Sequence, residues 1–88
     1  MEEVLFEIER VQSRGDTAGM LRTVADRLDD GKSLTLSSGD DSITLEVPSQ
    51  TEFEVKVERE HESGGSELSI EFELEWGENG SDGGLDIA

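Results

Sequence analysis

Apolar and polar residues alternate most regularly in residues 67–76, which read ELSIEFELEW. Every second residue is apolar up to Trp76, the single tryptophan of the sequence, and the residues between them are glutamates apart from Ser69. A period of two places successive side chains on opposite faces of a strand. This stretch therefore predicts a strand with one apolar face and one acidic face, the latter carrying Glu71, Glu73 and Glu75.

Four other segments alternate in the same way and are also predicted to be strands. They are residues 3–11, 33–38, 42–47 and 51–60. The links SGDD at 38–41 and SGGS at 63–66 have the composition of turns. Pro48 ends the strand before it, because proline cannot donate a hydrogen bond to a ladder.

Between the first two of these segments the period changes to that of a helix, predicted over residues 14–30. Ser13 is a suitable N-cap, and Asp16 three residues later completes a pair that resembles a capping box. Leu21, Val24, Ala25 and Leu28 then recur at helical spacing and form one apolar stripe. Gly31 is the expected left-handed residue after the helix.

The order of these elements predicts an α+β fold: a single, antiparallel-rich five-stranded sheet with one helix packed on one face, in the order β-α-β-β-β-β. We expect residues 1–77 to form one domain and residues 78–88, rich in glycine and acidic residues, to be a disordered tail. Trp76 is assigned a structural role at the end of the core. Leu5 lies on the opposite parity to the apolar residues of its segment, so it is a candidate contact in a homodimer.

Charge changes this picture, because 23 acidic residues face only 7 lysines and arginines and the net charge is −16. Such acidity is typical of a disordered chain, of a binder of basic partners or cations, or of a protein in a cytoplasm at molar salt. The regular alternation argues against disorder. The scarcity of lysine and the even spread of carboxylates favour the saline interpretation, in which salt screens repulsion and monovalent cations associate without specificity.

The sequence argues against several function classes, and we expect a cytoplasmic protein. The sequence has no cysteine, which excludes disulfides and thiolate metal sites. It shows no signal peptide and no apolar run long enough to cross a membrane, so no membrane partner is expected. Nucleic acid is not expected either, because phosphate binding needs lysine and arginine.

Candidate catalytic or metal-binding residues are few. His61 is the single histidine, and without a second histidine or a cysteine it is expected to be a solvated loop residue. Asp40, Asp41 and the glycine- and aspartate-rich stretch 80–86 contain possible calcium ligands, but only one copy of the pattern is present. We therefore expect no enzyme, no cofactor and no metal site.

Taken together, the capped helix ending at Gly31, the hairpin with Gly39, Pro48, and the amphipathic strand closing on Trp76 resemble the Amphi-Trp domain. This small family is named for such a strand and its tryptophan and is common in extremely halophilic archaea. The resemblance covers residues 1–76. It implies no activity and no functional residue, and it agrees with the saline interpretation.

The function expected from these features is that of a small, non-enzymatic interaction or accessory module with a salt-adapted acidic surface. The candidate interaction residues are Leu5, Glu7, Glu54, Glu71, Glu73 and Glu75. The partner is either a second copy of the chain or another protein. The alternative is an acidic decoy, which binds basic proteins by resembling a nucleic-acid backbone.

Overall fold

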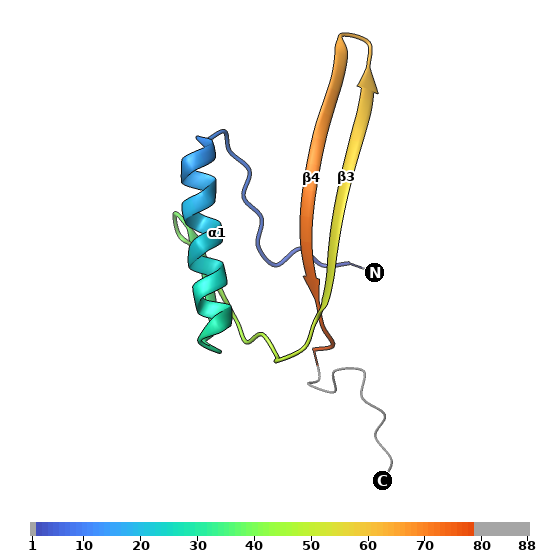
Figure 1. Cartoon of the computed structure of the whole chain (residues 1–88). Coiled ribbons are helices and arrows are strands. Elements are labelled where there is room, and N and C mark those ends of the chain that lie inside the picture. The colour runs from blue at the N-terminus through green and yellow to red at the C-terminus, as the bar shows by residue number, and fades with distance from the viewer. Residues whose placement is uncertain (1, 79–88) are drawn as a thin grey trace, which may run out of the picture. The chain divides into compact units, whose positions relative to one another are not determined.

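The computed structural model describes residues 2–78 and contains one helix and four strands (Figure 1). In chain order they are α1 (Arg14–Asp29), β1 (Leu34–Ser38), β2 (Asp41–Leu45), β3 (Glu52–Glu62) and β4 (Gly65–Glu75). The chain divides between Val47 and Pro48 into two compact units, each with its own hairpin. The α+β class predicted from the sequence is confirmed. Residues 79–88, most of the predicted tail, lie outside the described residues.

The predicted five-stranded sheet is wrong. The four strands form two separate two-stranded antiparallel sheets, β1–β2 and β3–β4. In each sheet the strands are adjacent in sequence and are joined by two residues, so their pairing is as local as strand pairing can be. Alternation of side chains fixes the two faces of a strand but carries no information about its neighbours, and the error arose at that step.

Residues 3–11 do not form the predicted first strand, and residues 2–12 run without regular secondary structure. A strand requires a ladder partner for its backbone N–H and C=O groups, and no strand of the described chain pairs with this segment. Leu5 is 65% exposed there. Alternation in residues 3–11 was therefore not sufficient to predict a strand.

The helix begins and ends where the capping residues indicate. The Asp16 backbone N–H donates to the Ser13 hydroxyl at 3.0 Å, which is half of a capping box. At the other end the Lys32 N–H donates to the Arg27 carbonyl at 3.0 Å, and the Gly31 N–H donates to the Leu28 carbonyl at 3.2 Å. Gly31 has φ +67°, which completes a Schellman motif.

In the first unit α1 lies beside β1. The β1–β2 hairpin turns at Gly39 and Asp40, and Gly39 has φ +59°, the pattern of a type II′ turn. The hydroxyls of Thr35 and Thr44, directly opposite each other, are hydrogen-bonded at 2.9 Å. Apolar residues of this unit are half-buried, among them Val24, Leu28, Leu34, Ile43 and Leu45.

Neither unit, taken by itself, has a set of fully buried side chains that would form a core. Among residues 2–78 no side chain is fully buried. A two-stranded hairpin has one apolar face but no second layer of its own to cover that face, and stable domains are built from two packed layers. The second unit is the clearest case, because its described elements are β3 and β4 alone.

Candidate interaction surface on the β3–β4 hairpin

The register of β3 and β4 sorts their side chains into two faces. Phe53 lies opposite Leu74, and further along the ladder Val57 lies opposite Ile70. Because every second residue shares a face, we define the apolar face as Phe53, Val55, Val57, Leu68, Ile70, Phe72 and Leu74. Arg59, opposite Leu68, and His61, opposite Ser66, lie on the same side nearer the hairpin turn. The acidic face is defined as the nine glutamates on the other side, Glu52, Glu54, Glu58, Glu60, Glu62, Glu67, Glu71, Glu73 and Glu75.

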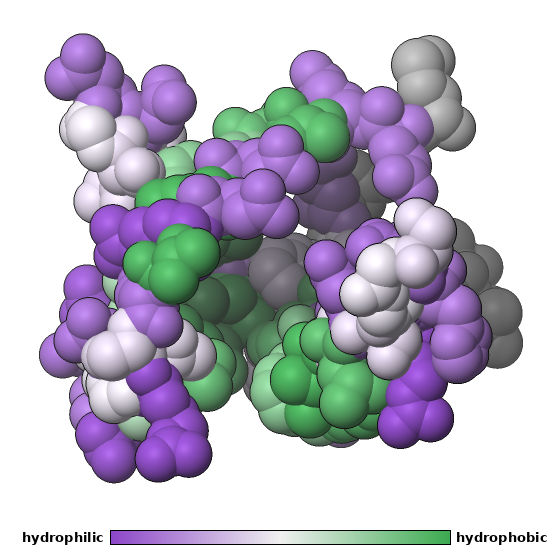
Figure 2. All heavy atoms as spheres, turned by 90° about the horizontal axis from the view of Figure 1, so that it is seen from above, coloured by the Kyte–Doolittle hydropathy of each residue, from purple (hydrophilic) through white to green (hydrophobic). Residues whose placement is uncertain are grey.

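Within the second unit, taken by itself, no other described element covers the apolar face. Six of its seven side chains are between 51% and 68% exposed, and only Leu74 is half-buried. The rings of Phe53 and Phe72 are stacked, with centroids 6.4 Å apart and planes at 11°. In the end-on view of Figure 2 the hairpin carries apolar side chains on one side and hydrophilic ones on the other. The face is thus a continuous apolar strip with an aromatic end.

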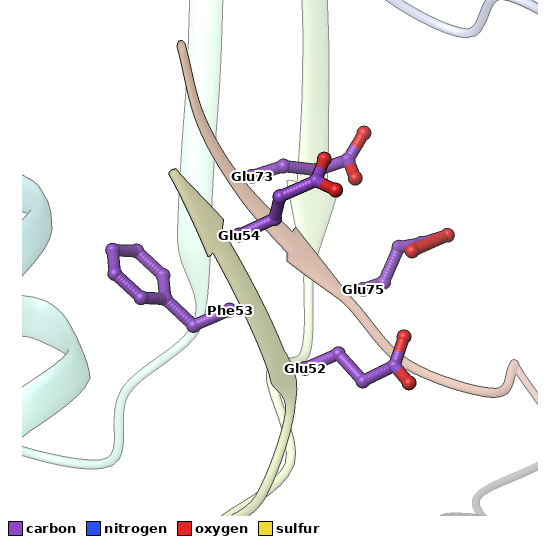
Figure 3. A pocket seen from close by; sticks show the side chains of 5 residues that line it. All are labelled: Glu52, Phe53, Glu54, Glu73 and Glu75. Atoms are coloured by element: carbon purple, nitrogen blue, oxygen red, sulfur yellow. The ribbon is translucent and has the colours of Figure 1, made fainter. Parts of the chain in front are cut away.

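The acidic face places like charges directly opposite one another. Glu52 pairs with Glu75, Glu54 pairs with Glu73, and the other end of the ladder pairs Glu60 with Glu67. Side chains directly opposite in a ladder lie about 5 Å apart, and like charges there are destabilising. Figure 3 shows the first four of these glutamates on one side of the hairpin and Phe53 on the other. These five residues line a shallow, open depression and not an enclosed cavity.

Electrostatic strain on this face is evident at Glu73. The pKa of Glu73 is raised above its ordinary value of 4.5, chiefly by the charge of Glu75 and then by partial desolvation and by Glu54 and Glu71. Lys56 offsets the crowding in part. It lies opposite Glu71 and its ammonium is 3.5 Å from the carboxylate of Glu58.

The same neighbours raise the pKa of Lys56 above 10.5, with Glu58 the largest cause and Glu71 the next. Both members of the Lys56–Glu58 pair are at least half exposed, so this ion pair adds little to stability. Internal ion pairs within β3–β4 therefore offset little of the charge of the acidic face.

Of the residues predicted from the sequence, Glu54, Glu71, Glu73 and Glu75 are brought together on the acidic face. Leu5 and Glu7 belong to the first unit, where they lie in the segment without regular structure. The sequence analysis did not name the other glutamates of this face as candidate interaction residues. They are Glu52, Glu58, Glu60, Glu62 and Glu67. These glutamates alternate with the apolar residues of two strands that a tight turn joins. That alternation alone would have placed them on the acidic face.

Trp76 follows the last residue of β4 and is half-buried. It continues the alternation of Phe72 and Leu74, so its parity places it at the end of the apolar face. Its structural role stays a prediction.

The described chain brings together no metal site. No three His, Cys, Asp or Glu side chains within residues 2–78 are arranged to hold a metal ion. His61 lies within β3 opposite Ser66, and not in the loop expected for it, while Asp40 and Asp41 lie at the turn and start of β2. The calcium-like stretch 80–86 lies outside the described residues. The helix of residues 2–78 is too short and too polar to cross a membrane.

These features define a small α+β protein with an amphipathic last strand that closes on a tryptophan. The profile of the Amphi-Trp domain matches residues 1–88. The chain therefore belongs to the Amphi-Trp domain family, as the resemblance predicted. Neither a curated protein nor a solved structure matches the chain.

Proposed function

We propose that this protein is a small, non-enzymatic interaction or accessory module that contacts other protein through the apolar face of β3–β4. The observation that carries the proposal is the exposure of that face: six of its seven side chains are at least half exposed. Side chains of this kind, each half exposed, leave roughly 600 Å² of contiguous apolar surface, the size at which patches mark interaction sites.

The acidic face supports a place for this module in a cytoplasm at molar salt. β3 and β4 carry nine glutamates against Lys56 and Arg59, a net charge of −7. At molar salt the Debye length is about 3 Å, so repulsion between neighbouring carboxylates is largely screened. The acidic face then remains hydrated, which leaves the apolar face as the side available for protein contacts.

The proposal is tested by affinity capture in molar KCl with three forms of the tagged protein: the natural sequence, Ile70→Glu and Ser69→Glu. The two variants add the same charge at neighbouring positions of β4 but on opposite faces. We expect the natural sequence and Ser69→Glu to retain a defined protein, which can be an untagged copy of the chain, and Ile70→Glu to lose it. Equal retention by all three forms, or no retention by any, contradicts the proposal.

A second candidate function, the acidic decoy, is favoured by one observation, the row of glutamates on a single face. A basic partner would then bind the acidic face by charge complementarity. The same capture experiment separates the two. Basic nucleic-acid-binding proteins that are retained by Ile70→Glu, and lost when Glu71, Glu73 and Glu75 are all changed to Gln, would favour the decoy.

A further inference from the structure

We infer that the apolar face of β3–β4 is covered by the same face of a second copy of this chain, related by a two-fold axis. This inference rests on the proposed function and names the partner. It is carried by three features of the hairpin: the area of the face, the distribution of side-chain size along it, and the position of the charges.

The area is sufficient for a specific dimer. With roughly 600 Å² of exposed apolar surface on each copy, a face-to-face pair would remove about 1,200 Å² from water, the lower end of the range for specific interfaces. The buried surface would be mainly aliphatic and aromatic side chains, as in the centre of homodimer interfaces.

Side-chain size along the face suits a two-fold arrangement. The aromatic end carries Phe53 and Phe72, whereas the end nearer the hairpin turn carries Val57, Leu68 and Ile70, with Arg59 on the same side. In a two-fold pair with antiparallel hairpins, the aromatic end of one copy lies over the aliphatic end of the other. The phenylalanine rings of each copy then face the smaller Val57, Leu68 and Ile70 of the other, which helps facing layers to fill space evenly.

The charges favour stacking of faces over pairing of strand edges. In a stacked pair both acidic faces point outward into the salt solution, and no glutamate is taken out of water. Pairing β3 or β4 by its edge with a second copy would instead extend the acidic face and place further glutamate rows side by side, where like charges are destabilising. Charged side chains are a common protection of sheet edges against such pairing.

Cross-linking tests the inference directly, because the natural sequence has no cysteine. Ile70→Cys places one thiol near the middle of the apolar face, and the matched control Ser69→Cys places one on the acidic face. Stacked sheets lie about 10 Å apart, too far for a direct disulfide, so a short bis-maleimide is the suitable reagent. In molar KCl we expect a covalent dimer from Ile70→Cys and at least about tenfold less from Ser69→Cys, a difference that the opposite faces require. Equal yields, or none from Ile70→Cys, would overturn the inference.

Sedimentation in molar KCl provides the second measurement, on proteins without a thiol. The natural sequence and Ser69→Glu should form dimers, and Ile70→Glu should raise the dissociation constant at least about tenfold, because it buries an unpaired charge. Val57→Thr is a milder change on the same face and should weaken the dimer without adding a charge. It keeps the test decisive if Ile70→Glu does not fold. A monomer that still retains another protein through this face would overturn the dimer and leave the proposed function standing.

Discussion

The two hairpins of this protein follow the same local rules but differ in what each needs to be stable. β1–β2 has five residues in each strand, carries only Asp40 and Asp41 as charges, and has α1 beside it. β3–β4 has eleven residues in each strand, a net charge of −7, and an apolar face on which six of the seven side chains are at least half exposed. A long amphipathic hairpin thus gains ladder hydrogen bonds with length, but it also gains an apolar face to cover and a charged face to screen.

Removal of salt should produce the largest difference between the hairpins. On going from molar to about 10 mM KCl the Debye length grows from about 3 to 30 Å, and the glutamates of β3–β4 then repel one another along the whole face. We expect amide hydrogen exchange to become fast in residues 52–75 while residues 34–45 change little. The comparison fails if both hairpins keep their protection, or if both lose it at the same salt concentration.

Truncation of an apolar side chain should distinguish the hairpins by its dependence on protein concentration. Phe→Ala in a full core costs about 3–5 kcal/mol, so Phe72→Ala, at 52% exposure, should cost about 1–2 kcal/mol in dilute protein. The cost should rise with protein concentration, because the second copy would be lost as well. Ile43→Ala in β2 is the matched change, and its cost in denaturant melts should not depend on concentration. An identical dependence for both variants would argue against the dimer.

Glycine replacement should affect the first unit alone. Gly39→Ala forces a side chain into a positive φ and should cost about 1 kcal/mol, although the space around it is open. Gly19→Ala adds the same methyl group inside α1, also into open space, and should stabilise by about 0.5–1 kcal/mol. Denaturant melts monitored at the helix would measure both. If either variant changes how amide exchange in β3–β4 depends on salt, the stability of the second unit depends on that of the first.

Acid should have the smallest effect, and it should act on β3–β4. Because folding raises the pKa of Glu73 above 4.5, the folded hairpin binds this proton more tightly than the unfolded chain. The contribution of Glu73 is therefore most favourable below 4.5 and is lost as the pH rises through the folded pKa. At the lowest KCl concentration that keeps the hairpin folded, lowering the pH from about 7 to 5 should slightly raise its protection against exchange. Glu75→Gln removes the largest cause of the raised pKa of Glu73 and should reduce this increase in protection on acidification. If the increase is unchanged in Glu75→Gln, groups other than Glu73 cause it.

Much of the local structure was predictable because it depends on neighbouring residues. Ser13 and Gly31 located the two ends of α1, since capping is satisfied within one turn of the helix. Alternation located β3 and β4 and assigned Glu54 and Glu73 to one face, since the faces of a strand follow from its period.

The rest required information that alternation does not contain. The segment around Leu5 alternates much as β4 does, yet no strand of the described chain pairs with it. Pairing depends on a partner elsewhere in the sequence, and the prediction of five strands in one sheet assumed that partner. The exposure of Phe72 was also not predictable, because apolar parity shows which side chains share a face and not what covers them.

The most direct test of the two-faced hairpin is amide hydrogen exchange of residues 52–75 in molar KCl for Ile70→Glu and Ser69→Glu side by side. The two variants differ only in which face of β4 receives the new carboxylate. We expect exchange to accelerate in Ile70→Glu and to stay close to that of the natural sequence in Ser69→Glu. Equal acceleration in both variants, or none in either, would contradict the assignment of protein contact to the apolar face and of hydration to the acidic one.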